Sequence, residues 1–232
     1  MTRLDVLGEL QIDPHGPLAE GDGGAEDLWS LLFAYGQIFW PLEGRASWFS
    51  GLDAQLRDAS TTDGPLAIVE TADPSGDIPL TTLVLSVTQV LGLCGRLKTS
   101  GLEVTTQVPD DGPSWQPRSW IGNLARRTDS GEGIRMSLNC PESAGPDALP
   151  PAGKLGPRIE ELLALGGREL RCSAEASPSG VDLLVREMRW AELQAAHLID
   201  LSILSLHAAG FRGAVTVSVQ PLSARGAAGR PR

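Results

Sequence analysis

The chain has 232 residues, of which 41% are hydrophobic and 5% aromatic, a composition typical of one large globular domain or two small ones. Twenty-nine acidic residues against nineteen basic ones give a formal net charge of -10. Because such a field repels phosphate, we expect no generic binding to nucleic acid or to an anionic membrane surface. Composition names neither a reaction nor a ligand, and no motif indicates a cofactor, which therefore stays unknown.

The three cysteines, Cys94, Cys140 and Cys172, are widely spaced and form no C-x-x-C pair, so neither a disulfide scaffold nor a zinc site is indicated. The N-terminal stretch lacks the uninterrupted apolar region of a secretory signal. We therefore expect a cytoplasmic protein. Residues 78–95 carry no formal charge and have the length of a membrane helix, but their bulky side chains gather on one side, which favours a packed core helix.

Hydrophobic periodicity predicts the elements of the first part of the chain. In order they are strand 5–12, helix 25–39, a helical piece over 46–58, strand 65–72, helix 80–98 and strand 101–108. The third strand of this part is expected to be missing or reduced to the few residues after Gly76. The second part predicts strand 133–140, helix 155–165, strand 168–176, strand 181–189, helix 191–210 and strand 213–220. This β-α-β-β-α-β order is that of ferredoxin-like folds.

Three landmarks recur in the same order in both parts and indicate an internal duplication. They are a first strand stopped by proline, a strand that runs into a proline-glycine turn, and a long helix followed by glycine, an alternating strand and proline. Their positions are 5–14 and 133–141, 66–76 and 170–180, and 101–109 and 213–221. We predict an α+β protein of two tandem, related ferredoxin-like halves with antiparallel sheets, the first half being divergent.

The domain organisation follows from these elements. Residues 1–112 are expected to form the first half with an aromatic-rich helical insertion, and residues 133–222 the second half. Between them, residues 113–132 form a connector that contains tryptophan and arginine, and residues 223–232 form a mobile tail.

The final predicted helix carries two of the three histidines. His197, Asp200 and His207 fall within an arc of about 80 degrees at 100 degrees per residue. His197 and Asp200 could act as a general acid/base pair. His197 and His207 lie about 15 Å apart along the helix, too far to bind one ion, so no metal site is predicted. The alternative is a partly buried, hydrogen-bonded helix face.

Aromatic residues crowd into one short segment of the first half. Such side chains concentrate at partner interfaces, line pockets for flat ligands, or fill a core. The candidate partner-binding residues are Trp29, Phe33, Trp40, Trp48 and Phe49. A second cluster beside Trp115 and Trp120 could bind an anionic ligand or be a solvated charged face; its members are Arg118, Arg126 and Arg127.

These patterns favour a non-catalytic cytoplasmic binding or assembly protein that acts through the aromatic-rich segment. Its partner is another protein or a second copy of the same chain, since closed dimers are common. Whether the chain is an enzyme stays open. The alternative function is a small-molecule isomerase, cyclase or oxygenase that holds an apolar substrate between helices and sheet and uses His197 with Asp200.

Overall fold

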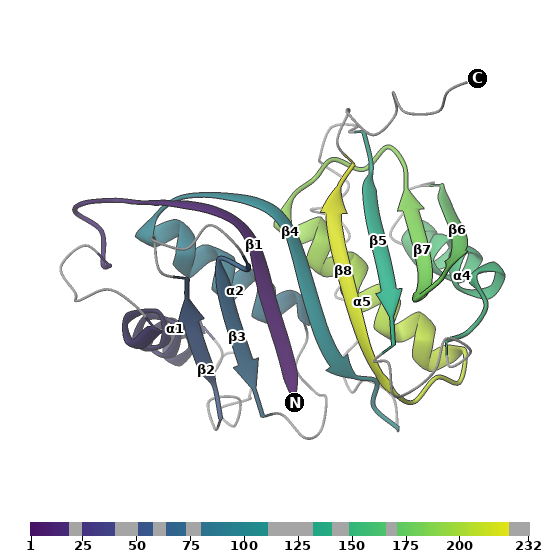
Figure 1. Ribbon diagram of the computed structural model, residues 1–232, viewed down its shortest axis with the longest axis horizontal. Helices are drawn as coiled ribbons and strands as arrows, with labels where there is room; N and C mark the ends of the chain where they lie inside the picture. The colour runs from purple at the N-terminus through teal and green to yellow at the C-terminus, as the bar shows by residue number, and fades with distance from the viewer. Residues whose placement is uncertain are drawn as a thin grey trace.

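The computed structural model describes residues 1–18, 25–39, 51–57, 64–72, 80–110, 132–140, 149–165 and 171–222. Within these ranges the protein is a mixed α+β structure with four helices and one eight-stranded antiparallel sheet. Figure 1 shows the strands side by side, with the helices layered against the sheet.

Both halves of the chain contribute the same order of elements. The first half contains β1 (Thr2–Ile12), α1 (Ala25–Phe39), β2 (Asp53–Leu56), β3 (Ala67–Thr71), α2 (Leu80–Cys94) and β4 (Gly95–Gln107). The second half contains β5 (Ile134–Asn139), α4 (Ala152–Leu165), β6 (Cys172–Ser177), β7 (Gly180–Val185), α5 (Glu192–Ala208) and β8 (Ala214–Pro221).

The sheet places the two halves next to each other in a single layer. Its strand order is β2-β3-β1-β4-β8-β5-β7-β6, so the last strand of one half pairs with the last strand of the other. In this central pair Val104 lies opposite Val217, and Leu102 lies opposite Val219. The halves therefore share a continuous hydrogen-bonded sheet.

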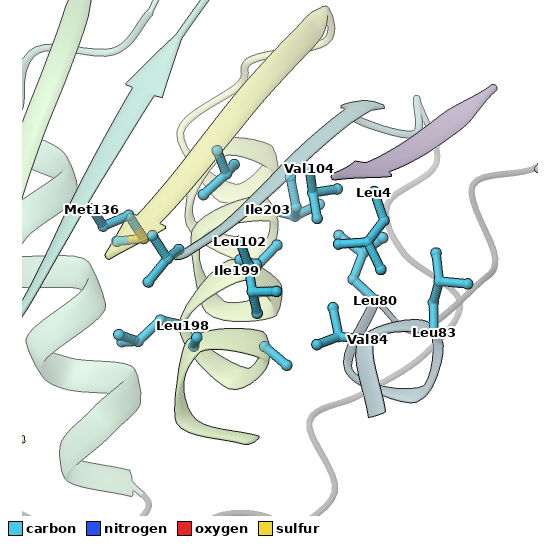
Figure 2. Close-up of a cluster of buried hydrophobic side chains, with 14 of the residues drawn as sticks. Leu4, Leu80, Leu83, Val84, Leu102, Val104, Met136, Leu198, Ile199 and Ile203 are labelled. Atoms are coloured by element: carbon cyan, nitrogen blue, oxygen red, sulfur yellow. The ribbon is translucent and has the colours of Figure 1, made fainter. Parts of the chain in front are cut away.

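Burial alternates along the strands because only one face of the sheet packs against helices. On β4, Leu102 and Val104 are fully buried, whereas Glu103 between them and Thr105 after them are partly exposed. Figure 2 shows the packed side, where Ile199 of α5 lies beneath β4. Leu80 and Val84 of α2 lie to the right of Ile199 in this view. One apolar core thus runs under both halves.

The strands β1 and β4 extend beyond their other neighbours as a two-stranded arm. β3 pairs only with residues 2–6 of β1, and β8 pairs only with residues 102–107 of β4. The arm continues to the pair of Ile12 and Gly95, after a register shift between Leu7 and Gly8. Gly95 permits a close approach, because a Cβ atom there would lie 2.1 Å from the Gln11 carbonyl oxygen.

Three sequence predictions about local structure are wrong. Residues 53–56, expected in a helical piece, form β2, so the strand missing from the predicted pattern lies before β3 rather than after Gly76. β2 escaped detection because it is a four-residue edge strand in which only Ala54 is buried. The helix expected to reach residue 98 ends at Cys94, where β4 begins without a loop.

The third error concerns the strand followed by a proline-glycine turn. This landmark paired residues 66–72 with residues 170–176. In the sheet these segments are β3 and β6, which are the third strand of the first half and the second strand of the other. They are not equivalent in position, because β3 lies next to β1 whereas β6 is an outer strand.

No helix in the described part of the chain is long and apolar enough to cross a membrane.

Candidate functional site

The helix α1 presents an aromatic pair at its outer surface. Leu28 and Leu32 are buried against the core, and between them Trp29 keeps 37% of its surface exposed. The ring of Trp29 stacks on that of Phe33, with centroids 5.1 Å apart and planes inclined by 15°. Because the two residues are four positions apart on a helix, they lie on the same side of it.

The indole of Trp29 is held in place rather than free to rotate. Its Nε1–H donates a 2.9 Å hydrogen bond to the Leu52 carbonyl oxygen, just before β2. The polar edge of the ring is therefore satisfied, and the exposed part of the ring is an apolar surface of fixed orientation. A rigid, partly exposed tryptophan is a common anchor of protein interfaces because it contributes a large area at low entropy cost.

A tyrosine connects the same helix to its neighbour. The Tyr35 hydroxyl donates to Oε1 of Gln89 on α2. Burial raises the pKa of Tyr35 above its ordinary value. The aromatic pair on α1 thus lies on a helix that is hydrogen-bonded both to the residue before β2 and to α2.

Other predicted site residues fall outside the described part of the chain. Trp40, Trp48 and Phe49 of the aromatic segment do so, as do Arg118, Arg126 and Arg127 of the connector. The structure therefore places two of the five predicted partner-binding residues, Trp29 and Phe33, and it places them together.

Asp200 lies at the interface between α5 and the start of α2. Its Oδ1 accepts the Leu80 N–H at 3.1 Å, and its Oδ2 accepts the Thr81 N–H at 3.2 Å and the Thr81 hydroxyl. These donors belong to the first turn of α2, where backbone N–H groups have no partner within the helix. Burial raises the pKa of Asp200 to about 7, and the hydrogen bonds from Thr81 and Leu80 oppose that rise.

His197 lies one turn before Asp200 on α5 and is also buried, with 7% of its surface exposed. Burial lowers the pKa of its imidazole to about 4. Most of α5 is buried on its other sides too, and its Leu198, Ile199 and Ile203 belong to the apolar cluster that Figure 2 shows. The predicted acid/base pair is thus buried in the helix layer, and both carboxylate oxygens of Asp200 accept hydrogen bonds from α2.

His207 is separate from this pair, in the last turn of α5. Its buried Nε2 atom has no hydrogen-bond partner among the described residues. Within the described ranges, no three His, Cys, Asp or Glu side chains come together as a metal-binding group.

A surface hollow of about 320 Å³ lies at the end of the two-stranded arm. It is lined by residues of the β1 end and the α2–β4 junction, among them Ile12, Leu93 and Arg96. Leu93 is 65% exposed and Ile12 41%. Sequence reasoning missed this hollow, because it depends on a helix that ends directly in a strand. None of the predicted site residues lines it.

No protein-family model, no curated protein and no solved structure matches this chain.

Proposed function

We propose that this chain is a non-catalytic cytoplasmic binding or assembly protein that acts through the aromatic surface of α1. The observation that carries the proposal is the fixed and partly exposed Trp29, stacked on Phe33. The sequence that follows continues with Trp40, Trp48 and Phe49, so the aromatic character of this region extends past the helix. The free energy of the system falls when a partner covers an apolar surface of this kind.

A second copy of the same chain is the proposed partner. A twofold dimer buries the same patch on both subunits, so Trp29 would contribute to the interface twice, once from each subunit. Catalysis at His197 and Asp200 has weaker support, because both oxygens of Asp200 already accept hydrogen bonds from the start of α2.

We also propose that the two halves are ferredoxin-like copies of one ancestral unit. The proposal is supported by their identical element order and by the strand orders β2-β3-β1-β4 and β6-β7-β5-β8. The sequence landmarks aligned residues 101–109 with residues 213–221, Gly101 with Gly213. This alignment needs one change, because it matches Glu103, which is partly exposed, with Val215, which is buried.

A shift by one residue restores the agreement of faces between the halves. It matches Leu102 with Val215 and Val104 with Val217, all of which are fully buried. Val104 and Val217 are also direct partners across the central strand pair. A local twofold axis between these two residues would relate the halves, and a superposition of the halves in an experimental structure would test it.

Sedimentation velocity over a range of concentrations tests the function. We expect the wild-type chain to dimerise and Trp29→Ala to weaken the dimer at least about tenfold, as the loss of an interface anchor does. Leu93→Ala is the matched control, since it truncates an exposed apolar side chain elsewhere. Circular dichroism verifies that both variants fold. A monomeric wild type, or equal weakening by both variants, would contradict self-association through α1.

A further inference from the structure

The outer strand β6 has a row of backbone groups that face away from the sheet. Along an antiparallel strand, successive residues direct their N–H and C=O groups alternately to one side and the other. The Arg186 N–H donates to the Arg171 carbonyl oxygen at 3.1 Å, so in this register the odd-numbered residues bond to β7. The N–H and C=O groups of Cys172, Ala174 and Ala176 therefore point toward the open edge.

A side chain of α4 occupies the first of these groups. The Cys172 N–H donates a 2.5 Å hydrogen bond to Oε1 of Glu160. The carboxylate oxygen lies where the carbonyl oxygen of an added strand would accept the same N–H. Glu160 is held at this edge because α4 packs closely on β6: a Cβ atom at Gly156 would lie 3.0 Å from the Cβ atom of Ala174.

The first half has a corresponding contact at the other end of the sheet. Figure 1 shows α1 beside β2 there, as α4 lies beside β6. The Arg57 N–H donates to the Leu66 carbonyl oxygen, so in this register the Leu52 carbonyl group faces the open edge. It accepts the Nε1–H of Trp29 on α1 at 2.9 Å. Since α1 and α4 have the same place in the element order, both halves occupy an edge group with a side chain of the corresponding helix.

β6 lacks the features that usually prevent an outer strand from pairing with another chain. Such features are a very short strand, proline, lysine or a bulge. β6 has six residues, contains neither proline nor lysine, and pairs with β7 without a register shift. β2, in contrast, has only four residues. A block by a side chain is therefore needed most at β6.

A second copy of β6 is a suitable strand to add at this edge. In an antiparallel pair with Ala174 opposite Ala174 of the second copy, Ser173 lies opposite Glu175 and no like charges meet. The chain already contains a junction between its halves of this kind, in which β4 pairs antiparallel with β8.

We propose that Glu160 blocks the open edge of β6 against the β6 strand of a second copy, so that the sheet ends at this strand. The carboxylate occupies the Cys172 N–H and the space that the carbonyl group of Ala176 of the second copy would take. This edge is separate from the aromatic surface of α1, and association there is measured on a different strand.

Amide exchange of the wild-type chain, followed by NMR at low concentration, tests the contact itself. After correction for intrinsic rates, the Cys172 amide should exchange at least about tenfold more slowly than those of Ala174 and Ala176, as expected for a hydrogen bond to a charged group. Equal rates for the three amides would overturn the proposal.

The same measurement at low and high concentration tests the block. Wild-type β6 should exchange at one rate throughout, whereas in Glu160→Ala the Ala174 amide should slow at least about threefold at high concentration. Alanine favours a helix, so this variant should fold, and circular dichroism verifies it. Glu161→Ala is the matched control, because it removes an exposed carboxylate from the next position of α4. It should behave as the wild type.

Two further variants separate the block from a change of charge. Glu160→Gln keeps an oxygen that can accept the Cys172 N–H, and β6 should again exchange at one rate. Addition of Ala174→Pro to Glu160→Ala removes an outward N–H without touching the ladder to β7, and should abolish the protection. Concentration-independent exchange of β6 in Glu160→Ala, or equal protection in Glu161→Ala, would overturn the block. Protection that survives Ala174→Pro would overturn pairing through this edge.

Discussion

Asp200 on α5 accepts the backbone N–H of Thr81 at a distance of 3.2 Å, so a carboxylate of the second half closes the N-terminus of a helix of the first. The N–H groups of the first turn of a helix have no partner within it, and a side-chain oxygen that accepts them explains the geometry. The same contact joins the two helix layers beneath the shared sheet. Asp200, which the sequence placed in a candidate catalytic pair, therefore has a structural role.

Replacement of this carboxylate should destabilise the protein. We expect Asp200→Ala to lower the free energy of unfolding by about 1–3 kcal/mol, because two buried N–H groups lose their acceptor. Urea denaturation measures the change. Asp182→Ala, which removes an exposed carboxylate from β7, should stay within about 0.5 kcal/mol of the wild type. Similar losses for the two variants would show that the helix cap contributes little.

The pKa values of Asp200 and His197 predict opposing effects of pH on stability. The folded pKa of Asp200 is about 7, above its ordinary 3.8, so its contribution to stability falls as pH rises from about 4 to 7. The folded pKa of His197 is about 4, below its ordinary 6.5, so its contribution falls as pH drops from about 6.5 to 4. Between about pH 4 and 6.5, Asp200 holds one proton in the folded state and His197 holds one in the unfolded state.

We therefore expect this pair to contribute no net slope to the stability of the wild type in that window. His197→Gln should leave a stability that falls with rising pH, and Asp200→Asn one that rises with pH, each by at most about 1.4 kcal/mol per pH unit. The double variant is the reference that subtracts all other titrating groups. Denaturation series at several pH values measure the three curves. Slopes of the same sign in the two single variants would refute the compensation.

The α2–β4 junction offers a matched pair of glycines. A Cβ atom at Gly95 would lie 2.1 Å from the Gln11 carbonyl oxygen, whereas one at Gly92, in the exposed side of α2, meets nothing within 4 Å. Gly95→Ala should therefore destabilise the protein by about 1–3 kcal/mol through overpacking. Gly92→Ala should stabilise it by about 0.5–1 kcal/mol through helix propensity. Thermal unfolding compares them, and changes of the same sign would contradict the close contact between β1 and β4.

Periodicity predicts most of this fold because most elements are long and have one buried side. α1 and α5 were expected within two residues of their observed bounds. β2 was missed, since one buried alanine in four residues carries no period. The partner of Asp200 was also unpredictable, because hydrophobic patterns describe a residue's own helix face and contain no information on a helix N-terminus about 120 positions away.

Part of the candidate site could be read from the sequence in the same way. Trp29 and Phe33 are four positions apart in a predicted helix, so their shared side follows from helix geometry. The hydrogen bond that fixes the Trp29 ring to Leu52 could not be foreseen, because Leu52 immediately precedes β2, a strand that the pattern did not reveal.

Hydrogen–deuterium exchange at low and high protein concentration tests the central claim most directly, because it locates the surface that a second copy covers. We predict that α1 (Ala25–Phe39) gains protection as concentration rises and that Trp29→Ala abolishes the gain. The outer strand β6 should exchange at the same rate at both concentrations. Protection that is independent of concentration, or that appears on β6 while α1 is unchanged, would contradict a function exercised through the aromatic surface of α1.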